Sequence, residues 1–305
     1  MKSSNAKTTS VRADLYERVT STIVSSLEQG VRPWLKPWSG DNAAGKITLP
    51  LRCNGVPYRG INILLLWGEA MDKGYSSPKW MTYRQAQELG GQVRKGEHGS
   101  LVVYADRFKK TEAGENGEDV EREIPFLRSY VVFCCDQIDG LPSEYYNKPE
   151  PKGETIQLVE SAERFFAATG AVFQHGGNMA FYAPSQDVIR LPYPEAFGDA
   201  ESYAATKAHE LTHWTAHESR LARTLGKRFG DDAYAAEELV AELGAAFLCG
   251  ALGITPEVRE DHAAYLGHWL KVLKADKRAI FTAAAHAQRA VDYLHGCQEA
   301  KAAAA

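Results

Sequence analysis

The chain has 305 residues, of which 44% are hydrophobic and 24% charged, an ordinary globular composition, and its formal net charge is −4. Its longest apolar run, INILLLW (61–67), is too short to cross a bilayer, and no apolar segment follows the opening residues 1–14. We therefore expect neither a membrane-spanning helix nor a secretory signal peptide, and the length suffices for two domains.

The first 145 residues predict an α+β domain. Leu15, Val19, Ile23 and Leu27 recur every fourth residue and precede Gly30, which predicts an amphipathic helix with a glycine end. A Pro- and Trp-containing loop follows at 31–40. Two short helices are expected at 61–74 and 82–91, each ended by glycine, and strands at 99–110 and 122–141 are joined by an acidic hairpin loop at 111–121.

Residues 146–155, rich in Pro, Gly and charge, are the predicted linker between the domains. The second domain, at 156–296, is expected to be mostly helical with a small β-sheet, followed by a tail at 297–305. A helix begins at 155, and a β-hairpin at 179–192 turns at Pro184–Asp187. The remaining helices are expected at 199–222, at about 232–252 and in two further segments before the tail.

The segment AHELTHWTAH (208–217) carries the pattern His-Glu-x-x-His. Residues four apart share one face of a helix, so His209 and His213 can direct imidazole nitrogens to one metal ion. Zn²⁺ is the expected ion, and another divalent transition metal would also suit these ligands. Glu210 is the expected catalytic base, which takes a proton from the metal-activated water.

A third ligand is expected from the helix at 232–252. Glu238 and Glu242 are four residues apart on an otherwise apolar helix, where an ionised carboxylate is costly without a partner. Glu238 is the predicted third ligand, and Glu242 the carboxylate that orients a ligand histidine. The two roles could be exchanged, and Glu237 is a weaker candidate. A structural zinc, closed to substrate, would use the same residues.

The first third of the chain combines aromatic residues with positive charge. Residues 1–111 contain 17 Lys and Arg against 9 Asp and Glu, a net charge of +8. Because bases of single strands stack on aromatic rings and cations follow the phosphates, this composition favours a single-stranded DNA partner. The alternative is that the tryptophans are core residues and the basic side chains an ordinary wet surface. The candidate DNA-binding residues are Trp34, Lys36, Trp38, Tyr58, Arg59, Lys79, Trp80, Arg94 and Lys95.

Five cysteines without a CxxC pair leave an odd count, as expected for reduced thiols in a cytoplasmic protein. With these features described, the chain resembles the ArdC family of antirestriction proteins, whose N-terminal domain is shared with TraC-type plasmid primases. The resemblance runs from Leu15 to about Gly296. It is carried by GVRPWLKPW, PYRGINILLLW, SPKWMTYRQAQELGGQVRKGEHG, YVVFCCDQIDGLP, HELTHWTAH and EELVAELGAAFL.

The resemblance implies an N-terminal domain that binds single-stranded DNA without strong sequence preference, and a C-terminal zincin-like metallopeptidase domain. It implies a role in conjugation, in which incoming plasmid DNA is protected from the restriction enzymes of the recipient. The gluzincin-like pattern falls on His209, His213 and one glutamate of 237–242. A protein or peptide substrate is then possible, and no membrane partner is expected. The alternative is a single-stranded DNA-binding protein whose metal site is structural and non-catalytic.

Overall fold

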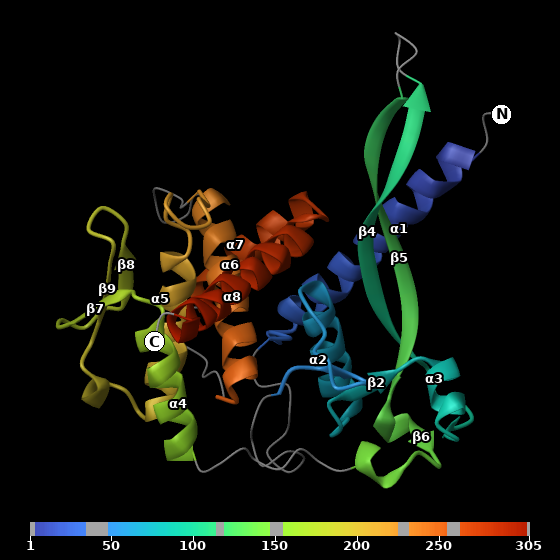
Figure 1. Cartoon of the computed structure of the whole chain (residues 1–305), viewed down its shortest axis with the longest axis horizontal. Helices are drawn as coiled ribbons and strands as arrows, with labels where there is room; N and C mark the ends of the chain where they lie inside the picture. The colour runs from blue at the N-terminus through green and yellow to red at the C-terminus, as the bar shows by residue number, and fades with distance from the viewer. Residues whose placement is uncertain are drawn as a thin grey trace.

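The computed structural model describes residues 4–34, 48–113, 119–146, 155–224, 232–254 and 263–303. Helices and small sheets are mixed, as predicted for an α+β protein, and the C-terminal part is mostly helical (Figure 1). The helices are α1 (Ser4–Glu28), α2 (Ile61–Lys73), α3 (Tyr83–Glu88), α4 (Thr155–Ala168), α5 (Ala200–Trp214), α6 (Asp232–Leu252), α7 (Ala263–Ala275) and α8 (Ala279–Ala303).

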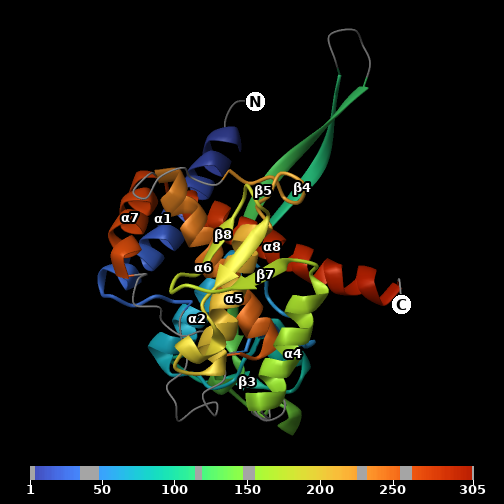
Figure 2. The ribbon, with the colours of Figure 1, turned by 90° about the vertical axis from the view of Figure 1, so that its left-hand side faces the viewer.

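A sheet of order β1-β2-β5-β4 organises the N-terminal part, from β1 (Leu51–Arg52), β2 (Lys79–Met81), β4 (Ser100–Ala113) and β5 (Asp119–Cys134). β4 and β5 pair antiparallel from Ser100 opposite Val132 to Ala113 opposite Asp119. They form a long ribbon that projects from the body (Figures 1 and 2). Both predicted strands and their pairing are confirmed. The hairpin loop is shorter than the predicted 111–121, because residues 111–113 and 119–121 belong to the strands, and 114–118 lies outside the described residues.

The predicted N-terminal helices are confirmed, and local sequence explains where they begin and end. Leu15, Val19, Ile23 and Leu27 are all buried along one side of α1. Gly74 ends α2 in the left-handed conformation, with φ of +68°, which favours glycine. Thr82 begins α3 with a capping box, in which its hydroxyl accepts from the Gln85 backbone N–H. One short strand that the sequence did not predict, β3 (Gln92–Val93), pairs with β6 (Ile138–Asp139). β6 lies within the strand predicted at 122–141, which the 3₁₀ turn Cys135–Gln137 divides in two.

The C-terminal part contains a three-stranded sheet of order β7-β9-β8, which packs against α5 (Figure 2). β8 (Phe181–Ala183) and β9 (Val188–Leu191) form the predicted hairpin. β7 (Val172–His175) was not predicted, because its four residues show no apolar alternation; it pairs parallel to β9.

The predicted helix at 199–222 ends earlier, at Trp214. Arg220 Nε donates to the Trp214 carbonyl at 2.7 Å, and Arg223 Nη2 donates to the Thr212 carbonyl at 2.7 Å. In a longer helix, backbone N–H groups would bond to these carbonyls of the last turn. Because the two arginines bond to them instead, the chain can fold back at this point.

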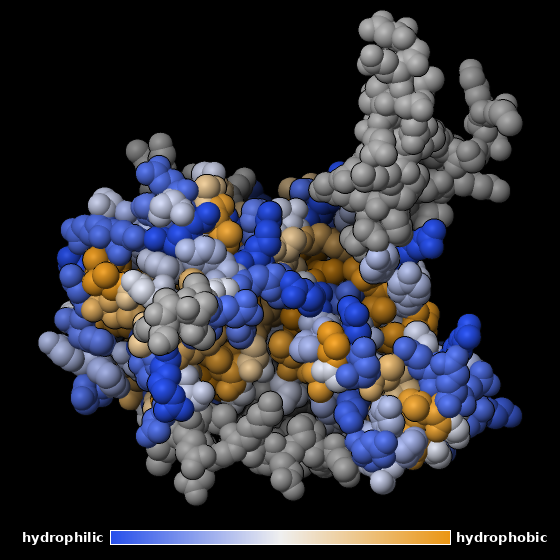
Figure 3. All heavy atoms as spheres, viewed as in Figure 1, coloured by the Kyte–Doolittle hydropathy of each residue, from blue (hydrophilic) through white to orange (hydrophobic). Residues whose placement is uncertain are grey.

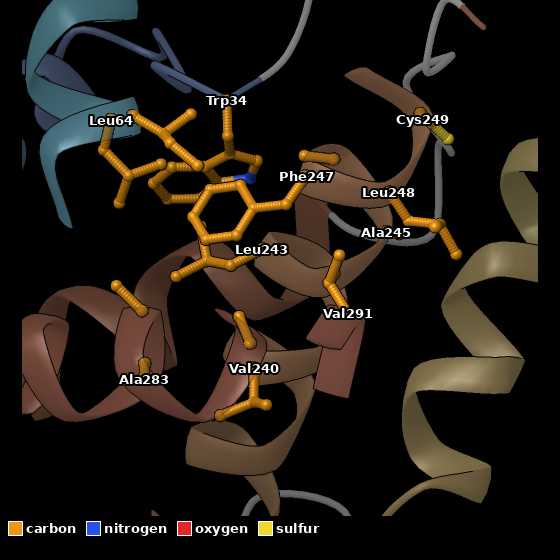
Figure 4. Close-up of a cluster of buried hydrophobic side chains, with 14 of the residues drawn as sticks. Trp34, Leu64, Val240, Leu243, Ala245, Phe247, Leu248, Cys249, Ala283 and Val291 are labelled. Atoms are coloured by element: carbon orange, nitrogen blue, oxygen red, sulfur yellow. The ribbon is translucent and has the colours of Figure 1, made fainter. Parts of the chain in front are cut away.

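One hydrophobic core cluster joins the N- and C-terminal parts of the chain. Trp34 and Leu64 from the N-terminal part lie against Phe247 and Leu243 of α6 (Figure 4). The rings of Trp34 and Trp269 meet edge to face, with centroids 6.0 Å apart. The predicted linker, 146–155, lies almost entirely outside the described residues, and the predicted domain boundaries stay a prediction.

The face of the molecule in Figure 3 is largely hydrophilic, with apolar residues gathered near the root of the ribbon.

Candidate metal centre

Helix α5 carries both histidines of the His-Glu-x-x-His segment. Its N-terminus is capped by Asp199, whose carboxylate accepts from the Ser202 backbone N–H at 2.7 Å. The helix continues without a break through His209 and His213, whose ring centroids are 4.9 Å apart. The predicted shared face is confirmed.

Helix α6 brings Glu238 to these histidines because it packs very closely on α5. A Cβ at Gly244 would lie 2.5 Å from Cγ2 of Thr212, so only glycine permits this approach. Glu238 Oε2 lies 3.6 Å from His209 Nε2, and its Oε1 lies 3.5 Å from His213 Nε2. The carboxylate therefore faces both imidazoles.

Donor atoms of His209, His213 and Glu238 all lie within 4.8 Å of one another, and they form the group in the described part of the chain that could hold a metal ion. Two imidazole nitrogens and one carboxylate oxygen fit a divalent transition metal. The convergence of these three residues, expected from the spacing along the sequence, is present in the structure.

The carboxylate beside the second histidine is Glu237 and not Glu242. Glu237 Oε1 lies 3.4 Å from His213 Nδ1, the ring nitrogen that faces away from Glu238. Arg223 holds Glu237 in place, with Nη2 donating to Oε1 at 2.8 Å and Nε to Oε2 at 3.1 Å. At His213 the orienting carboxylate is therefore Glu237, which adjoins Glu238 and faces the second ring nitrogen. The orienting role expected of Glu242 stays a prediction for His209.

Glu210 and Glu242 are also buried in this region. The Glu210 charge acts on His213, which agrees with a position beside the three donors. Glu242 is not a member of the three-donor group among the described residues. Burial lowers the pKa of Arg32, and the negative charge of Glu242 offsets part of that effect.

The electrostatics of the site favour a bound cation. Burial opposes a charge on His213, but hydrogen bonds to Glu237 and Glu238 outweigh it and raise the pKa of His213 to about 10. Burial likewise works against ionisation of Glu238, while its contacts with the two histidines bring its pKa well below the usual value. Without a metal, the site balances its carboxylates with a proton on His213. A metal ion would displace that proton.

The structure contradicts the aromatic part of the predicted DNA surface. Trp34 is 0% exposed and Trp80 is 1% exposed, and Tyr58 is also buried. A ring enclosed by protein cannot stack on a base, so the prediction is wrong for these three residues. The alternative given from the sequence, that the tryptophans are core residues, is correct for Trp34 and Trp80. Trp38 and Lys36 lie outside the described residues.

The remaining predicted basic residues lie at the surface, mostly beside acceptors. Arg59 is paired with Asp292 of α8, and Arg94 with Glu97 at 2.8 Å. Lys79 Nζ donates to the Glu144 carbonyl at 2.7 Å, and Lys95 is exposed. Exposed pairs of this kind contribute little to stability, so these side chains can be redirected to phosphates at small cost.

Arg223 and the orienting role of Glu237 were not expected from the sequence. Glu237 stood beside the predicted ligand and was weighed only as a weaker ligand. No local signal identified Arg223, which reaches Glu237 because residues 215–224 fold back after α5.

Two family models match the chain on either side of the predicted linker. A model described as the N-terminal domain of the anti-restriction factor ArdC matches residues 13–133. A model described as a zincin-like metallopeptidase matches residues 160–286.

Relatives extend the match over nearly the whole chain. The Uncharacterized protein y4eC of Sinorhizobium fredii is 42% identical over 298 residues, which cover 96% of this chain and 95% of that protein. A DNA primase TraC of Escherichia coli is 40% identical over 299 residues, which cover 93% of this chain but only 27% of the primase. The similarity to the primase therefore extends beyond the N-terminal domain, and this chain spans about a quarter of the primase.

Solved structures agree with the relatives. The metal-free crystal structure of the antirestriction ArdC protein from plasmid R388 is 46% identical, covers 94% of this chain and 98% of its own, and superposes with a TM-score of 0.78. The Mn(II)-bound structure of the same protein is 45% identical, with a TM-score of 0.74. None of the helices described for the present chain has the length and apolarity needed to cross a membrane.

Proposed function

Because the chain belongs to the ArdC family of antirestriction proteins, we propose that it binds single-stranded DNA without strong sequence preference and protects incoming conjugative plasmid DNA from host restriction. We further propose that its C-terminal part is a zinc-dependent metallopeptidase of the gluzincin type. The convergence of His209, His213 and Glu238 is the observation that carries the second proposal. The basic first third of the chain supports the first.

The proposed peptidase assigns one task to each side chain. His209, His213 and Glu238 would hold the cation, and Glu237, fixed by Arg223, orients the His213 ring. A divalent cation held there would supply Lewis acidity to a peptide carbonyl and would make a water easier to deprotonate. Glu210, adjacent to His209 and buried, accepts that proton. Zinc is the proposed metal, and the Mn(II)-bound relative supports a divalent cation in general.

Replacing Glu210 by glutamine should remove peptide hydrolysis and leave the metal in place. The amide keeps the size of the side chain but cannot accept the proton, so we expect the rate to fall by about 10²- to 10⁴-fold. The rate is measured with a fluorogenic peptide library and the metal content by elemental analysis of the same samples. Equal hydrolysis by both proteins would remove Glu210 from the mechanism.

A structural metal site is the second candidate function. It is favoured by the burial of His209, Glu210 and Glu238, since structural zinc sites are closed to substrate. In that case the wild-type chain hydrolyses no peptide, and Glu210→Gln protects DNA from restriction as well as wild type does.

Binding to single strands should be tight at low salt and weaken as salt is added, because released counterions drive it. The logarithm of the association constant should fall by about 0.7 per phosphate contacted for each tenfold increase in salt. Fluorescence anisotropy with a labelled oligothymidylate measures this slope, and a hairpin duplex of the same length is the comparison. Equal affinity for the two forms, or none for either, would contradict the proposal.

Protection of plasmid DNA during conjugation places the protein in the recipient cytoplasm. The five cysteines, Cys53, Cys134, Cys135, Cys249 and Cys297, are free thiols, which supports this proposed location. A protein or peptide substrate is proposed from the metal centre alone.

A further inference from the structure

Two tyrosines on the ribbon of β4 and β5 are exposed at its surface. Tyr104 is 44% exposed and Tyr130 is 45% exposed. Their ring centroids are 6.3 Å apart, and the planes are inclined at 58°. The two rings are therefore close neighbours and are both accessible to solvent.

The register of the ribbon explains this proximity. Val102 pairs with Tyr130, and Tyr104 pairs with Arg128. Paired residues and those two positions further along share a face of the sheet, so Tyr104 and Tyr130 are diagonal neighbours and Arg128 is on their face. Arg128 is exposed as well. Two accessible rings and a guanidinium thus occupy one face of the ribbon.

Within the described residues, no third strand continues beside the ribbon past its root. β2 pairs with β5 only at Phe133 and Cys134, and β4 is the edge strand, so within the described residues the ribbon is two-stranded from Tyr130 outward. The root of the ribbon is fixed in place. Asn62 of α2 accepts from the Val103 backbone N–H at 2.7 Å and donates to the Val103 carbonyl at 2.8 Å. The tyrosines therefore stand on a positioned element while remaining open to a ligand.

Other exposed tyrosines of the N-terminal part serve its internal structure. The Tyr83 hydroxyl accepts from Gln92 at 3.1 Å, and its ring meets Phe133 edge to face. The Tyr146 hydroxyl donates to the Ile138 carbonyl at 2.7 Å. Tyr83, which is 43% exposed, is consequently a matched control for the ribbon tyrosines.

We propose that Tyr104, Tyr130 and Arg128 form a platform on the ribbon on which bases of single-stranded DNA stack, with the guanidinium on the adjacent phosphate. This inference rests on the proposed DNA-binding function and locates it. Aromatic faces take up unpaired bases of any sequence, and arginine complements the phosphate charge. Duplex DNA keeps its bases stacked inside and offers the rings nothing comparable. In this proposal the exposed tyrosines stack on the bases, which the buried rings of Trp34, Trp80 and Tyr58 cannot do.

The test measures binding of fluorescein-labelled dT₂₀ by anisotropy at fixed salt. Tyr104→Ala and Tyr130→Ala should each weaken binding by about 5- to 150-fold, the range for loss of one stacked base. Tyr104→Phe and Tyr130→Phe, which keep the ring, should bind within about threefold of wild type, and so should the control Tyr83→Ala. Arg128→Gln should reduce the salt slope by about 0.7. Unchanged melting temperatures establish that the ribbon variants are folded.

A second measurement uses the unmodified protein. An oligonucleotide carrying 5-bromodeoxyuridine should crosslink on irradiation to peptides that contain Tyr104 or Tyr130, as mapped by mass spectrometry. Wild-type binding with no effect of the two alanine variants, or crosslinks confined to other segments, would overturn the platform and leave the proposed function standing. Loss of binding in the phenylalanine variants would assign the contact to the hydroxyls and overturn stacking. Absence of any single-strand binding by wild type would defeat the proposed function itself.

Discussion

Replacing Glu238 by alanine should abolish metal binding by the full-length chain. Glu238 is the carboxylate that faces both His209 and His213, and two imidazoles alone leave a divalent cation with too few protein ligands. Loss of a residue that only orients a metal ligand raises the dissociation constant of the metal by about 10- to 100-fold. Loss of the ligand Glu238 itself should raise it further. Competition with a chromogenic chelator measures the change.

Two neighbouring glutamates provide graded controls on the same helix. Glu237→Gln keeps the Glu238 ligand but weakens the hold on His213, so the affinity should fall by about 10- to 100-fold. Glu242→Gln should cost less affinity than Glu238→Ala, since Glu242 is outside the three-donor group. If Glu242→Gln lost the metal and Glu238→Ala retained it, the assignment of the two residues would be reversed.

Trp34→Ala should be among the most destabilising single substitutions in the chain. Trp34 is fully buried against Trp269 and belongs to the core cluster that joins both parts of the chain. Removal of a buried tryptophan side chain costs about 3–5 kcal/mol in the free energy of unfolding. For a chain of this size, that corresponds to a fall in melting temperature of about 5–8 °C. Differential scanning calorimetry measures the fall, and a single transition is expected because the core is shared.

The same variant separates a core role from a DNA-binding role. At a temperature well below its transition, the folded Trp34→Ala protein should bind a single-stranded oligonucleotide as wild type does. Val131→Ala, at a half-exposed position, is the control for small effects on stability. A Trp34→Ala protein of normal melting temperature that had lost DNA binding would return this ring to the DNA surface.

Local patterns predicted the parts of this protein that depend on local geometry. The apolar residues at every fourth position from Leu15 to Leu27 predicted a helix with one buried side, and these residues are buried on one side of α1. The pair His209 and His213 could be placed on one face because four residues make about one helical turn. Glu238 was found from the cost of burying an isolated carboxylate, a principle that needs no tertiary model.

Features that depend on how distant segments approach one another were not predictable. Neighbouring residues on a helix differ in direction by about 100°, so the choice between Glu237 and Glu242 beside His213 depends on the side from which α6 meets α5. That approach depends on Gly244 against Thr212, and on Arg223 after the chain turns back. The sequence contained these residues but no sign of their contact.

The tryptophans show the same limit. Aromatic and basic residues alternate along 32–95, a composition that suits a nucleic acid surface and a protein core equally well. Trp34 is buried because Trp269, 235 residues further along the chain, packs on it. By contrast, Tyr104 and Tyr130 lie in strands whose sequence suggested only a hairpin, and the register brings them together.

The metal content of the purified full-length protein, measured beside that of His209→Ala by inductively coupled plasma mass spectrometry, tests the metal centre most directly. We predict about one equivalent of a divalent transition metal in the wild-type protein and less than about a tenth of an equivalent in the variant. The same metal at the same stoichiometry in both proteins would contradict the site formed by His209, His213 and Glu238.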